Sequence, residues 1–187
     1  VLAANDATLA TTALRPHLIW GPRDPHIIPR LMARRQQGRL AQVGDGQNKV
    51  AISYIDNAAA AHLQAADVLG LGSANAGKPY FVSDAEPVVL WEWINTLLVD
   101  LGLEAIDRQV SVGLAHRVGA LLEWVWRVFG LSGEPPMTRF VAAELASSHW
   151  YDLSAARADF GYHPVIAPQE AMARTIAAFG GVDVSVT

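Results

Sequence analysis

Apolar residues recur along the chain in two spacings, which predict strands and helices. Short apolar runs between turn formers are typical of strands, and spacings of three and four are typical of helices. Strands are predicted at 10–14, 40–43, 50–55 and 79–82. Helices are predicted at 27–37, 58–69, 88–101, 112–131, 138–146, 154–160 and 168–179, and residues 1–5 read as a helix end. This alternation indicates an α/β protein, with too few strands for a complete doubly wound sheet.

Turn formers and capping residues predict where these elements begin and end. GDGQNK at 44–49 predicts a hairpin-type turn between two strands. Asp56 or Asn57 is expected to cap the helix that follows it, because a side-chain oxygen can accept from the free N–H groups of the first turn. Asp152 is expected to cap a later short helix in the same way.

Composition narrows the class of protein. The chain has 187 residues, of which 51% are hydrophobic and 17% charged, so it is long and apolar enough for a folded core. The net charge of −4 and the lack of a Lys/Arg run do not support nucleic-acid binding. The absence of cysteine excludes disulfides, zinc–thiolate sites and cysteine nucleophiles within the chain.

Several sequence features that resemble catalytic motifs do not satisfy them. GLGSANAG at 70–77 contains G-x-G, but it follows a predicted helix and precedes a strand, the reverse of a dinucleotide loop. The six histidines are scattered without metal-ligand spacing, and no G-x-S-x-G motif is present. We therefore expect no metal site and no serine-hydrolase chemistry.

The helix predicted at 112–131 is almost entirely apolar. Its polar positions include His116, Glu123 and Arg127, and the last two have the spacing of an i,i+4 ion pair. Such a helix is either mostly buried or lies at an interface. Ordinary packing, a homodimer contact and peripheral membrane contact all remain open, the last because Trp124 and nearby arginines suit the lipid headgroup region.

Three ordered segments resemble a known superfamily. LRPHLIWGPRD at 14–24, GDGQNKVAISYIDNAAAAH at 44–62 and DLSAARADFGYHP at 152–164 resemble landmarks of extended short-chain dehydrogenases/reductases. This is the NAD-dependent epimerase/dehydratase superfamily, and the likeness is greatest to its 3β-hydroxysteroid dehydrogenase/isomerase branch. The resemblance implies the C-terminal part of an extended Rossmann fold, a doubly wound parallel sheet, with a small, mostly helical substrate-binding region.

The resemblance also implies a domain division. Residues 1–70 would form the end of the dinucleotide-binding domain. Residues 71–180 would form the substrate-binding or lid region, with a sheet-associated strand near 79–83. Residues 181–187 would be a tail. In this family the glycine-rich loop and a catalytic Tyr-x-x-x-Lys pair come before these landmarks, so we expect the chain to be the C-terminal half of an enzyme, inactive alone.

The implied activity of the parent protein is NAD(P)-dependent hydride transfer. The substrate would be a hydrophobic compound with a hydroxyl or keto carbon: a 3β-hydroxysteroid, a sterol carboxylate, or a β-keto or β-hydroxy acid. NAD is preferred over NADP, and no catalytic residue is expected in this chain. The alternatives are a nucleotide-sugar epimerase or dehydratase, and a non-catalytic relative that senses a dinucleotide or binds a partner.

Candidate site residues follow from the resemblance. The loop after the first strand is implied to orient the nicotinamide through main-chain groups, although a purely structural turn is the alternative. The implied cofactor-binding residues are Pro16, His17 and Leu18. The implied substrate-binding residues are Ile19, Trp20, His26, Ile27 and Met137.

Departures from the pattern of nucleotide-sugar enzymes favour an apolar substrate. Those relatives usually carry Asn at Leu18, Arg near Val50, and polar contacts near Ala142 and Leu145. A diphosphate needs charge-assisted donors, and these apolar residues provide none. Three residues could meet a substrate carboxylate or hydroxyl, unless they only brace the loop: His17, Arg23 and His26.

The remaining expectations concern partners and location. We expect a small hydrophobic substrate and no nucleic acid. No apolar run approaches the roughly 18–20 residues of a membrane-spanning helix. The predicted location is cytoplasmic, with the helix at 112–131 as a candidate for peripheral membrane contact.

Overall fold

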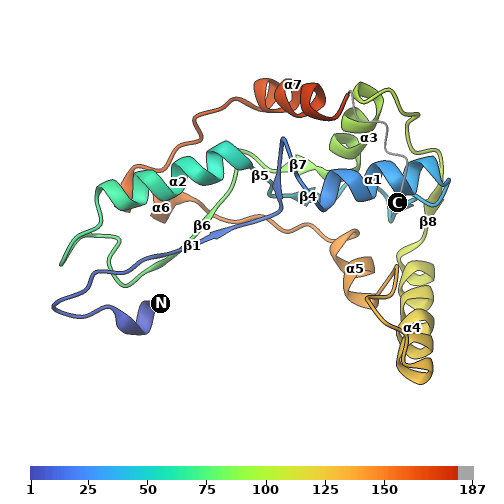
Figure 1. The fold of residues 1–187 in the computed structure, drawn as a ribbon, viewed down its shortest axis with the longest axis horizontal. Coiled ribbons are helices and arrows are strands. Elements are labelled where there is room, and N and C mark those ends of the chain that lie inside the picture. The colour runs from blue at the N-terminus through green and yellow to red at the C-terminus, as the bar shows by residue number, and fades with distance from the viewer. Residues whose placement is uncertain (181–187) are drawn as a thin grey trace. The chain divides into compact units, whose positions relative to one another are not determined.

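The computed structural model describes residues 1–180, and the predicted tail at 181–187 lies outside them (Figure 1). A 3₁₀ turn at Leu2–Ala4 replaces the expected helix end. The strands are β1 (Ala13–Pro16), β2 (Ile19–Trp20), β3 (Gln42–Val43), β4 (Lys49–Val50), β5 (Ser53–Tyr54), β6 (Pro79–Val82), β7 (Val88–Val89) and β8 (Gln109–Val110). The helices are α1 (Ile27–Gln36), α2 (Ile55–Asp67), α3 (Leu90–Asp100), α4 (Val112–Phe129), α5 (Arg139–Glu144), α6 (Ser154–Phe160) and α7 (Pro168–Phe179).

The predicted helices are all present, whereas the strands differ more from expectation. The strand predicted at 10–14 is displaced to Ala13–Pro16, and Pro16 is its last residue. A proline can end a strand because the ladder no longer needs its missing N–H. The segment predicted at 50–55 divides between β4 and β5, and β2 lies where only a loop was predicted.

The chain forms two compact units from interleaved segments. The first contains residues 1–28, 51–87 and 150–180, and the second contains 29–50 and 88–149. Each unit has its own cluster of buried apolar side chains. The predicted boundary at residue 70, between cofactor binding and substrate binding, concerns function and stays a prediction.

The first unit is built on parallel strand pairs. β1 pairs with β6, with Pro16 opposite Val82, and β2 pairs with β5. α2 and α6 contribute to the apolar cluster beside β6, in which Tyr80, Phe160 and Tyr162 are buried. Tyr162 also donates from its hydroxyl to the Ser83 carbonyl oxygen at 2.6 Å. This arrangement fixes the end of β1, where the candidate cofactor loop begins.

The second unit corrects the predicted hairpin at 44–49. β3 pairs in parallel with β8, and β4 pairs antiparallel with β7, so the two strands that flank the turn do not pair with each other. Each strand finds its partner in a later segment that packs with it on a shared core. Trp91 and Ile94 of α3 lie in that core, and the Trp91 indole N–H donates to the Leu145 carbonyl oxygen at 3.1 Å.

The expected cap of α2 is wrong. α2 begins at Ile55, its N-cap residue is Tyr54, and no side chain caps it. Asp56 and Asn57 therefore lie inside the first turn, where their side chains bind other segments. Asp152 accepts from the Ser154 N–H at 2.9 Å, but the N-cap residue of α6 is Leu153 and has no side-chain cap bond.

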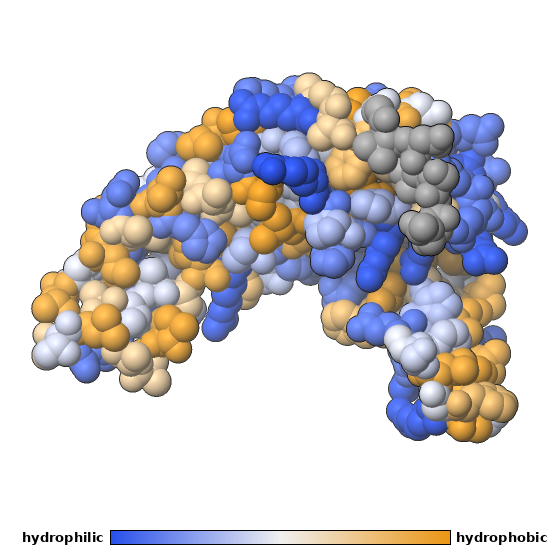
Figure 2. Space-filling model, in the orientation of Figure 1, coloured by the Kyte–Doolittle hydropathy of each residue, from blue (hydrophilic) through white to orange (hydrophobic). Residues whose placement is uncertain are grey.

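α4 is mostly exposed, so the alternative of a mostly buried helix is wrong, and the homodimer and membrane alternatives stay predictions. It buries Ala115 and Gly119, while Trp124 is 57% exposed. Figure 2 shows apolar surface, coloured orange, over this helix. The predicted Glu123–Arg127 ion pair is wrong, because Glu123 instead accepts from the Arg139 guanidinium at 2.8 Å. Among the described residues, no helix is long and apolar enough to cross a membrane.

Gly119 explains how α4 and α5 approach so closely. A Cβ atom on Gly119 would lie 2.6 Å from the backbone carbonyl carbon of Thr138. Thr138 is also the N-cap of α5, and its hydroxyl accepts from the Val141 N–H at 3.1 Å. The glycine therefore admits the capped end of α5 against α4.

Candidate functional site

The loop that follows β1 holds a leucine in an unusual backbone conformation. Leu18 has φ +44°, in the left-handed region. A residue with a Cβ atom pays about 1–2 kcal/mol for that region. Such conformations persist where the surroundings impose them, and they are frequent at functional sites. Leu18 is therefore held in place by its neighbours.

Ser53 of β5 is the residue that holds this loop. Its Oγ accepts from the His17 N–H at 3.2 Å and lies 2.8 Å from the His17 carbonyl oxygen, to which it donates. The Ser53 N–H donates to the Leu18 carbonyl oxygen at 3.2 Å. Within residues 1–180, no hydrogen bond engages the Leu18 N–H. The N–H of the strained residue Leu18 is thus available as a main-chain donor.

The His17 side chain braces the same loop. Its Nδ1 lies 2.7 Å from the Ala51 carbonyl oxygen, so Nδ1 carries the proton and donates. The ring meets Tyr151 edge to face with centroids 5.3 Å apart, and Tyr151 stacks on Phe81 at 3.9 Å. These contacts give the imidazole a structural role, whereas the predicted cofactor role concerned the His17 main chain.

A small pocket follows the loop and brings several predicted residues together. It has a cavity of about 210 Å³, lined by residues 19–26 and Ile55. The predicted substrate residues Ile19, Trp20 and His26 lie in its lining, together with Arg23. Trp20 is 2% exposed and meets the Tyr54 ring edge to face at 5.4 Å, so it forms part of the floor.

Asp24 determines where the pocket ends and α1 begins. Its Oδ1 accepts from the N–H groups of His26 at 2.8 Å and Ile27 at 3.2 Å, and its Oδ2 accepts from the Ile28 N–H at 2.9 Å. Ile27, predicted to bind substrate, is the half-buried first residue of α1. Sequence reasoning missed Asp24, although an aspartate just before a helical pattern is an N-cap signal.

Asp84 is a buried carboxyl group that the sequence did not reveal. It is 8% exposed and accepts from the Tyr54 N–H at 3.1 Å and from the Asn57 side-chain amide at 2.8 Å. Burial raises the pKa of the Asp84 carboxyl, although hydrogen bonds from Asn57, the Tyr54 N–H and Trp20 lower it. Asp84 therefore links the pocket floor to the start of α2.

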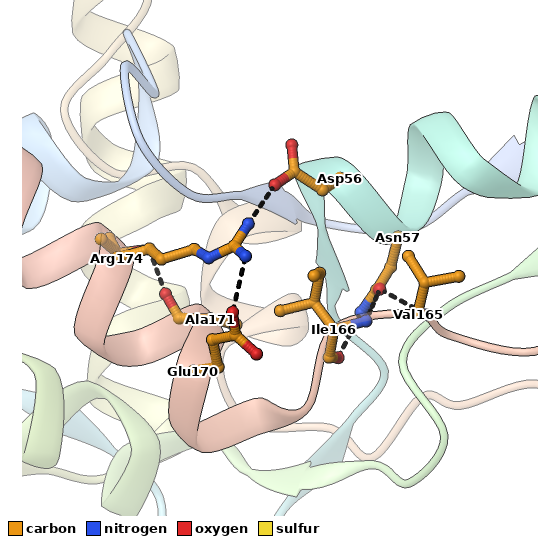
Figure 3. Close-up of polar contacts among 8 residues, drawn as sticks. Asp56, Asn57, Val165, Ile166, Glu170, Ala171 and Arg174 are labelled. Carbon is orange, nitrogen blue, oxygen red and sulfur yellow. Dashed lines mark hydrogen bonds and ion pairs between the residues drawn. The ribbon is translucent and has the colours of Figure 1, made fainter.

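Asn57 joins α2 to the segment before α7 (Figure 3). Its Oδ1 accepts from the N–H groups of Val165 at 2.9 Å and Ile166 at 2.8 Å, and its Nδ2 donates to the Ile166 carbonyl oxygen at 3.1 Å. Beside it, Arg174 of α7 pairs with Asp56 and Glu170. These contacts fix the C-terminal segment on the first unit.

Met137, the remaining predicted substrate residue, belongs to the second unit. It lines an apolar cavity of about 260 Å³ together with Trp91, Ile94 and Leu145. The structure therefore groups Met137 with that cavity and groups Ile19, Trp20 and His26 with the smaller pocket of the first unit.

Two positions used to infer an apolar substrate lie in the core. Val50 and Ala142 are both 0% exposed and belong to the apolar cluster of the second unit. Leu145, in contrast, lines the cavity. The apolar character of Val50 and Ala142 is thus explained by packing alone.

The parallel strand pairs, their covering helices and the loop at the carboxyl end of β1 define an α/β protein of the Rossmann class. The crystal structure of gox2253 has a TM-score of 0.61 and 22% identity over 89% of this chain and 48% of that one. The Bordetella bronchiseptica enzyme WbmH in complex with NAD⁺ has a TM-score of 0.59 and 17% identity over 94% and 47%. At these identities the likeness establishes the fold.

Sequence comparison gives the family. Residues 1–112 match the 3-beta hydroxysteroid dehydrogenase/isomerase family, and the chain belongs to it. It is 52% identical over 174 residues to a 2-alkyl-3-oxoalkanoate reductase of Stenotrophomonas maltophilia, covering 93% of this chain and 53% of that protein. It is 31% identical over 184 residues to a mouse decarboxylating sterol-4-alpha-carboxylate 3-dehydrogenase, covering 96% and 51%. The chain spans about half the length of these relatives.

Proposed function

We propose that the protein containing this chain is an NAD(P)-dependent oxidoreductase acting on a hydrophobic carboxylic acid. It would transfer hydride between the nicotinamide and a hydroxyl or keto carbon of the substrate. The observation that carries the proposal is the loop after β1, where Leu18 is held at φ +44° with its N–H unengaged within residues 1–180. The names of the relatives, a reductase and a dehydrogenase, support the reaction class.

The fit of a nicotinamide dinucleotide rests on this loop. Ligands of such sheets bind at the carboxyl ends of the strands, and Pro16 is the last residue of β1. The Leu18 N–H is a donor suited to the oxygen of a nicotinamide carboxamide. When bound, the cofactor supplies or accepts the hydride, while the protein provides orientation. Several structural neighbours hold NAD, and whether this protein prefers NAD or NADP is part of the test.

The chain's own residues have binding and positioning roles in this proposal. Pro16, His17 and Leu18 would orient the nicotinamide, with Ser53 as the positioning residue behind them. Ile19, Trp20 and Ile27 would keep water from one side of the substrate. Arg23 and His26, which line the same pocket, would meet its carboxylate. No residue of this chain is proposed as the general acid that donates the substrate proton, or as the general base that accepts it.

The preferred substrate is a 2-alkyl-3-oxoalkanoate or its 3-hydroxy product. The relative that is 52% identical carries that name, and a sterol carboxylate is the second candidate, named for relatives near 31%. A nucleotide-sugar epimerase is less favoured, because the pocket at 19–26 offers a single arginine for two phosphate groups. A non-catalytic, dinucleotide-binding relative is the alternative from another class.

The test is cofactor oxidation by the whole protein, followed at 340 nm with NADH and NADPH. The panel contains 2-alkyl-3-oxo acids, sterol 4-carboxylates, 3-oxosteroids and UDP-sugars. Turnover of an apolar acid supports the proposal, and turnover of UDP-sugars alone contradicts it. Cofactor binding without turnover of any compound would favour the non-catalytic alternative.

A serine substitution tests the loop itself. Ser53→Ala removes the hydroxyl that fixes His17 and should raise KM for the cofactor about tenfold, since a positioned hydrogen bond is worth roughly 1–1.5 kcal/mol. Ser83→Ala is the control, because Ser83 is also buried but, within residues 1–180, its hydroxyl bonds only to the adjacent Asp84 carbonyl oxygen. Equal KM values for the two variants would remove Ser53 from the proposed role.

A further inference from the structure

The second unit contains an apolar cavity that the proposed function does not yet use. Its volume is about 260 Å³. The floor is formed by side chains that are almost fully buried: Leu40, Val43, Trp91, Ile94 and Ala115. Sites that enclose a whole drug-sized ligand usually measure about 300–1,000 Å³. This cavity is therefore suited to part of a ligand rather than to a complete four-ring sterol.

The rest of the lining of the cavity includes exposed apolar residues and two cations. Leu114 and Val118 of α4 line it and are 52% and 41% exposed, so the cavity opens beside this helix. Of the residues that line it, all of which are described, the charged ones are Arg34 and Arg39. An apolar floor in a cavity that is also lined by two arginines is complementary to an amphiphile with an apolar chain and an anionic group.

Neither of these two arginines has an acidic partner within residues 1–180. Arg34 donates to the Pro136 carbonyl oxygen at 2.8 Å, and Arg39 donates to the Gln37 side-chain oxygen at 3.3 Å. Both acceptors are neutral, and no carboxylate within residues 1–180 pairs with either arginine. Arg35, between them in sequence, is instead paired with Glu104 and Asp107. A guanidinium without an acidic partner beside an apolar cavity favours a carboxylate.

We propose that this cavity is a second ligand site, which binds the unbranched alkyl chain of a free long-chain carboxylic acid with its carboxylate held near Arg34, separately from the substrate that Arg23 and His26 would bind. The inference does not depend on the proposed reaction, because it rests on the cavity and the charges of the second unit. An aliphatic chain suits a cavity lined by Met137 and Ile94, because a flexible chain can adapt to an irregular apolar wall. The site thus selects for the length of one chain.

The experiment is calorimetric binding of octanoate, decanoate and dodecanoate to the whole protein, below their critical micelle concentrations. Each buried methylene is worth about 0.8 kcal/mol, so affinity should rise up to about fifteenfold for each added pair. Leu114→Trp should fill the opening and weaken dodecanoate binding at least tenfold. Leu121→Trp is the matched control, because Leu121 is 59% exposed on the same helix and does not line the cavity.

A second pair of variants tests the carboxylate contact. Arg34→Gln should weaken dodecanoate binding about tenfold and leave dodecanol binding unchanged, since only the acid needs the charge. Arg30→Gln is the control, because Arg30 is an exposed arginine of the same helix outside the cavity. If Arg34→Gln only impaired folding, it would weaken the binding of dodecanoate and of dodecanol equally, so it would not produce a selective loss of the acid.

The outcomes separate this inference from the proposed function. Equal effects of the two tryptophan variants, or no dependence on chain length, would overturn the alkyl-chain site even if the protein reduces 3-oxo acids. Equal weakening of acid and alcohol by Arg34→Gln would overturn the carboxylate contact. Chain-length-dependent binding without hydride transfer would support the cavity and reject the proposed oxidoreductase.

Discussion

Replacing Asn57 by alanine should destabilise the protein far more than most single substitutions. Asn57 is 1% exposed and makes four hydrogen bonds, two accepted and two donated. Asn57→Ala would leave the Val165 and Ile166 groups and one Asp84 oxygen without these partners. Each unsatisfied buried group costs about 1–3 kcal/mol, and because the bonds to Val165 and Ile166 are only partly buried we expect a total loss of about 4 kcal/mol. Losses of that size are exceptional and arise from few mechanisms.

Gln64 offers a matched control on the same helix. Its side-chain amide binds the main chain of His163 in the same way, because it donates to the His163 carbonyl oxygen at 3.0 Å and accepts from the His163 N–H at 3.2 Å. These bonds lie at the surface, so water can replace them in the variant. Gln64→Ala should therefore cost less than about 1 kcal/mol.

The assay is urea unfolding of the whole protein, combined with hydrogen exchange of the peptide that contains residues 163–168. Asn57→Ala should lower the unfolding free energy and speed exchange at Val165 and Ile166, whereas Gln64→Ala should do neither to a comparable extent. If the two variants lose equal stability, or exchange at Val165 and Ile166 is unchanged, the buried amide does not hold this segment and the reasoning fails.

Three further substitutions test other parts of the structure. Gly119→Ala should lower the unfolding free energy in chemical denaturation by at least about 2 kcal/mol, despite the higher helix propensity of alanine. Gly113→Ala is the control and should be neutral or stabilising, because there is open space around Gly113. Equal effects of the two variants would refute the close approach of α4 and α5. Tyr80→Phe should destabilise the protein at neutral pH, because the Tyr80 hydroxyl, 2.6 Å from the Asp159 carboxylate, is the largest cause of the lowered pKa of Asp159. This stabilisation is present above the ordinary carboxyl pKa and is lost as the pH falls through the lowered pKa of Asp159. A loss of stability that is the same in acid as at neutral pH would contradict this reasoning. If α4 contacts lipid, Trp124→Ser should reduce co-sedimentation of the whole protein with anionic vesicles. Absence of vesicle binding by the unsubstituted protein would refute lipid contact. If sedimentation velocity shows that the substitution dissociates a dimer, the exposed face of α4 binds a second copy of this chain instead.

The helices could be predicted because their signal is local. In α3, the residues at apolar spacing include Leu90, Trp91, Ile94, Leu97 and Leu98, and all five are buried. The cap of α2 was mispredicted because Asp56 and Asn57 have tertiary partners, which the local sequence does not reveal.

The strand pairing could not be predicted in the same way. β3 and β8 contain two residues each, and they pair across a sequence separation that a local pattern does not encode. GDGQNK has the composition of a hairpin turn, and its Gly44 and Gly46 do adopt positive φ. The turn is real, but its flanking strands pair with β8 and β7, because those segments pack with them on the same core.

The candidate site shows the same division between local and non-local information. Ile19, Trp20 and His26 were predicted together and line one pocket, because they are close in sequence. Ser53 and Asp84 were missed, because only the fold brings a serine of β5 and a carboxyl after β6 to this loop. Their roles in binding stay predictions.

The conformation of Leu18 indicates that the loop is set before any ligand binds. Its left-handed backbone costs about 1–2 kcal/mol, and glycine would avoid that cost. The three Ser53 bonds, each worth about 0.5–1.5 kcal/mol, are enough to offset it. Because these contacts lie within the first unit, the Leu18 N–H, which no hydrogen bond engages within residues 1–180, keeps its direction without help from a cofactor. Such preorganisation lowers the cost of ordering on binding, which is the physical reason why we propose that this loop orients a cofactor rather than only reversing the chain.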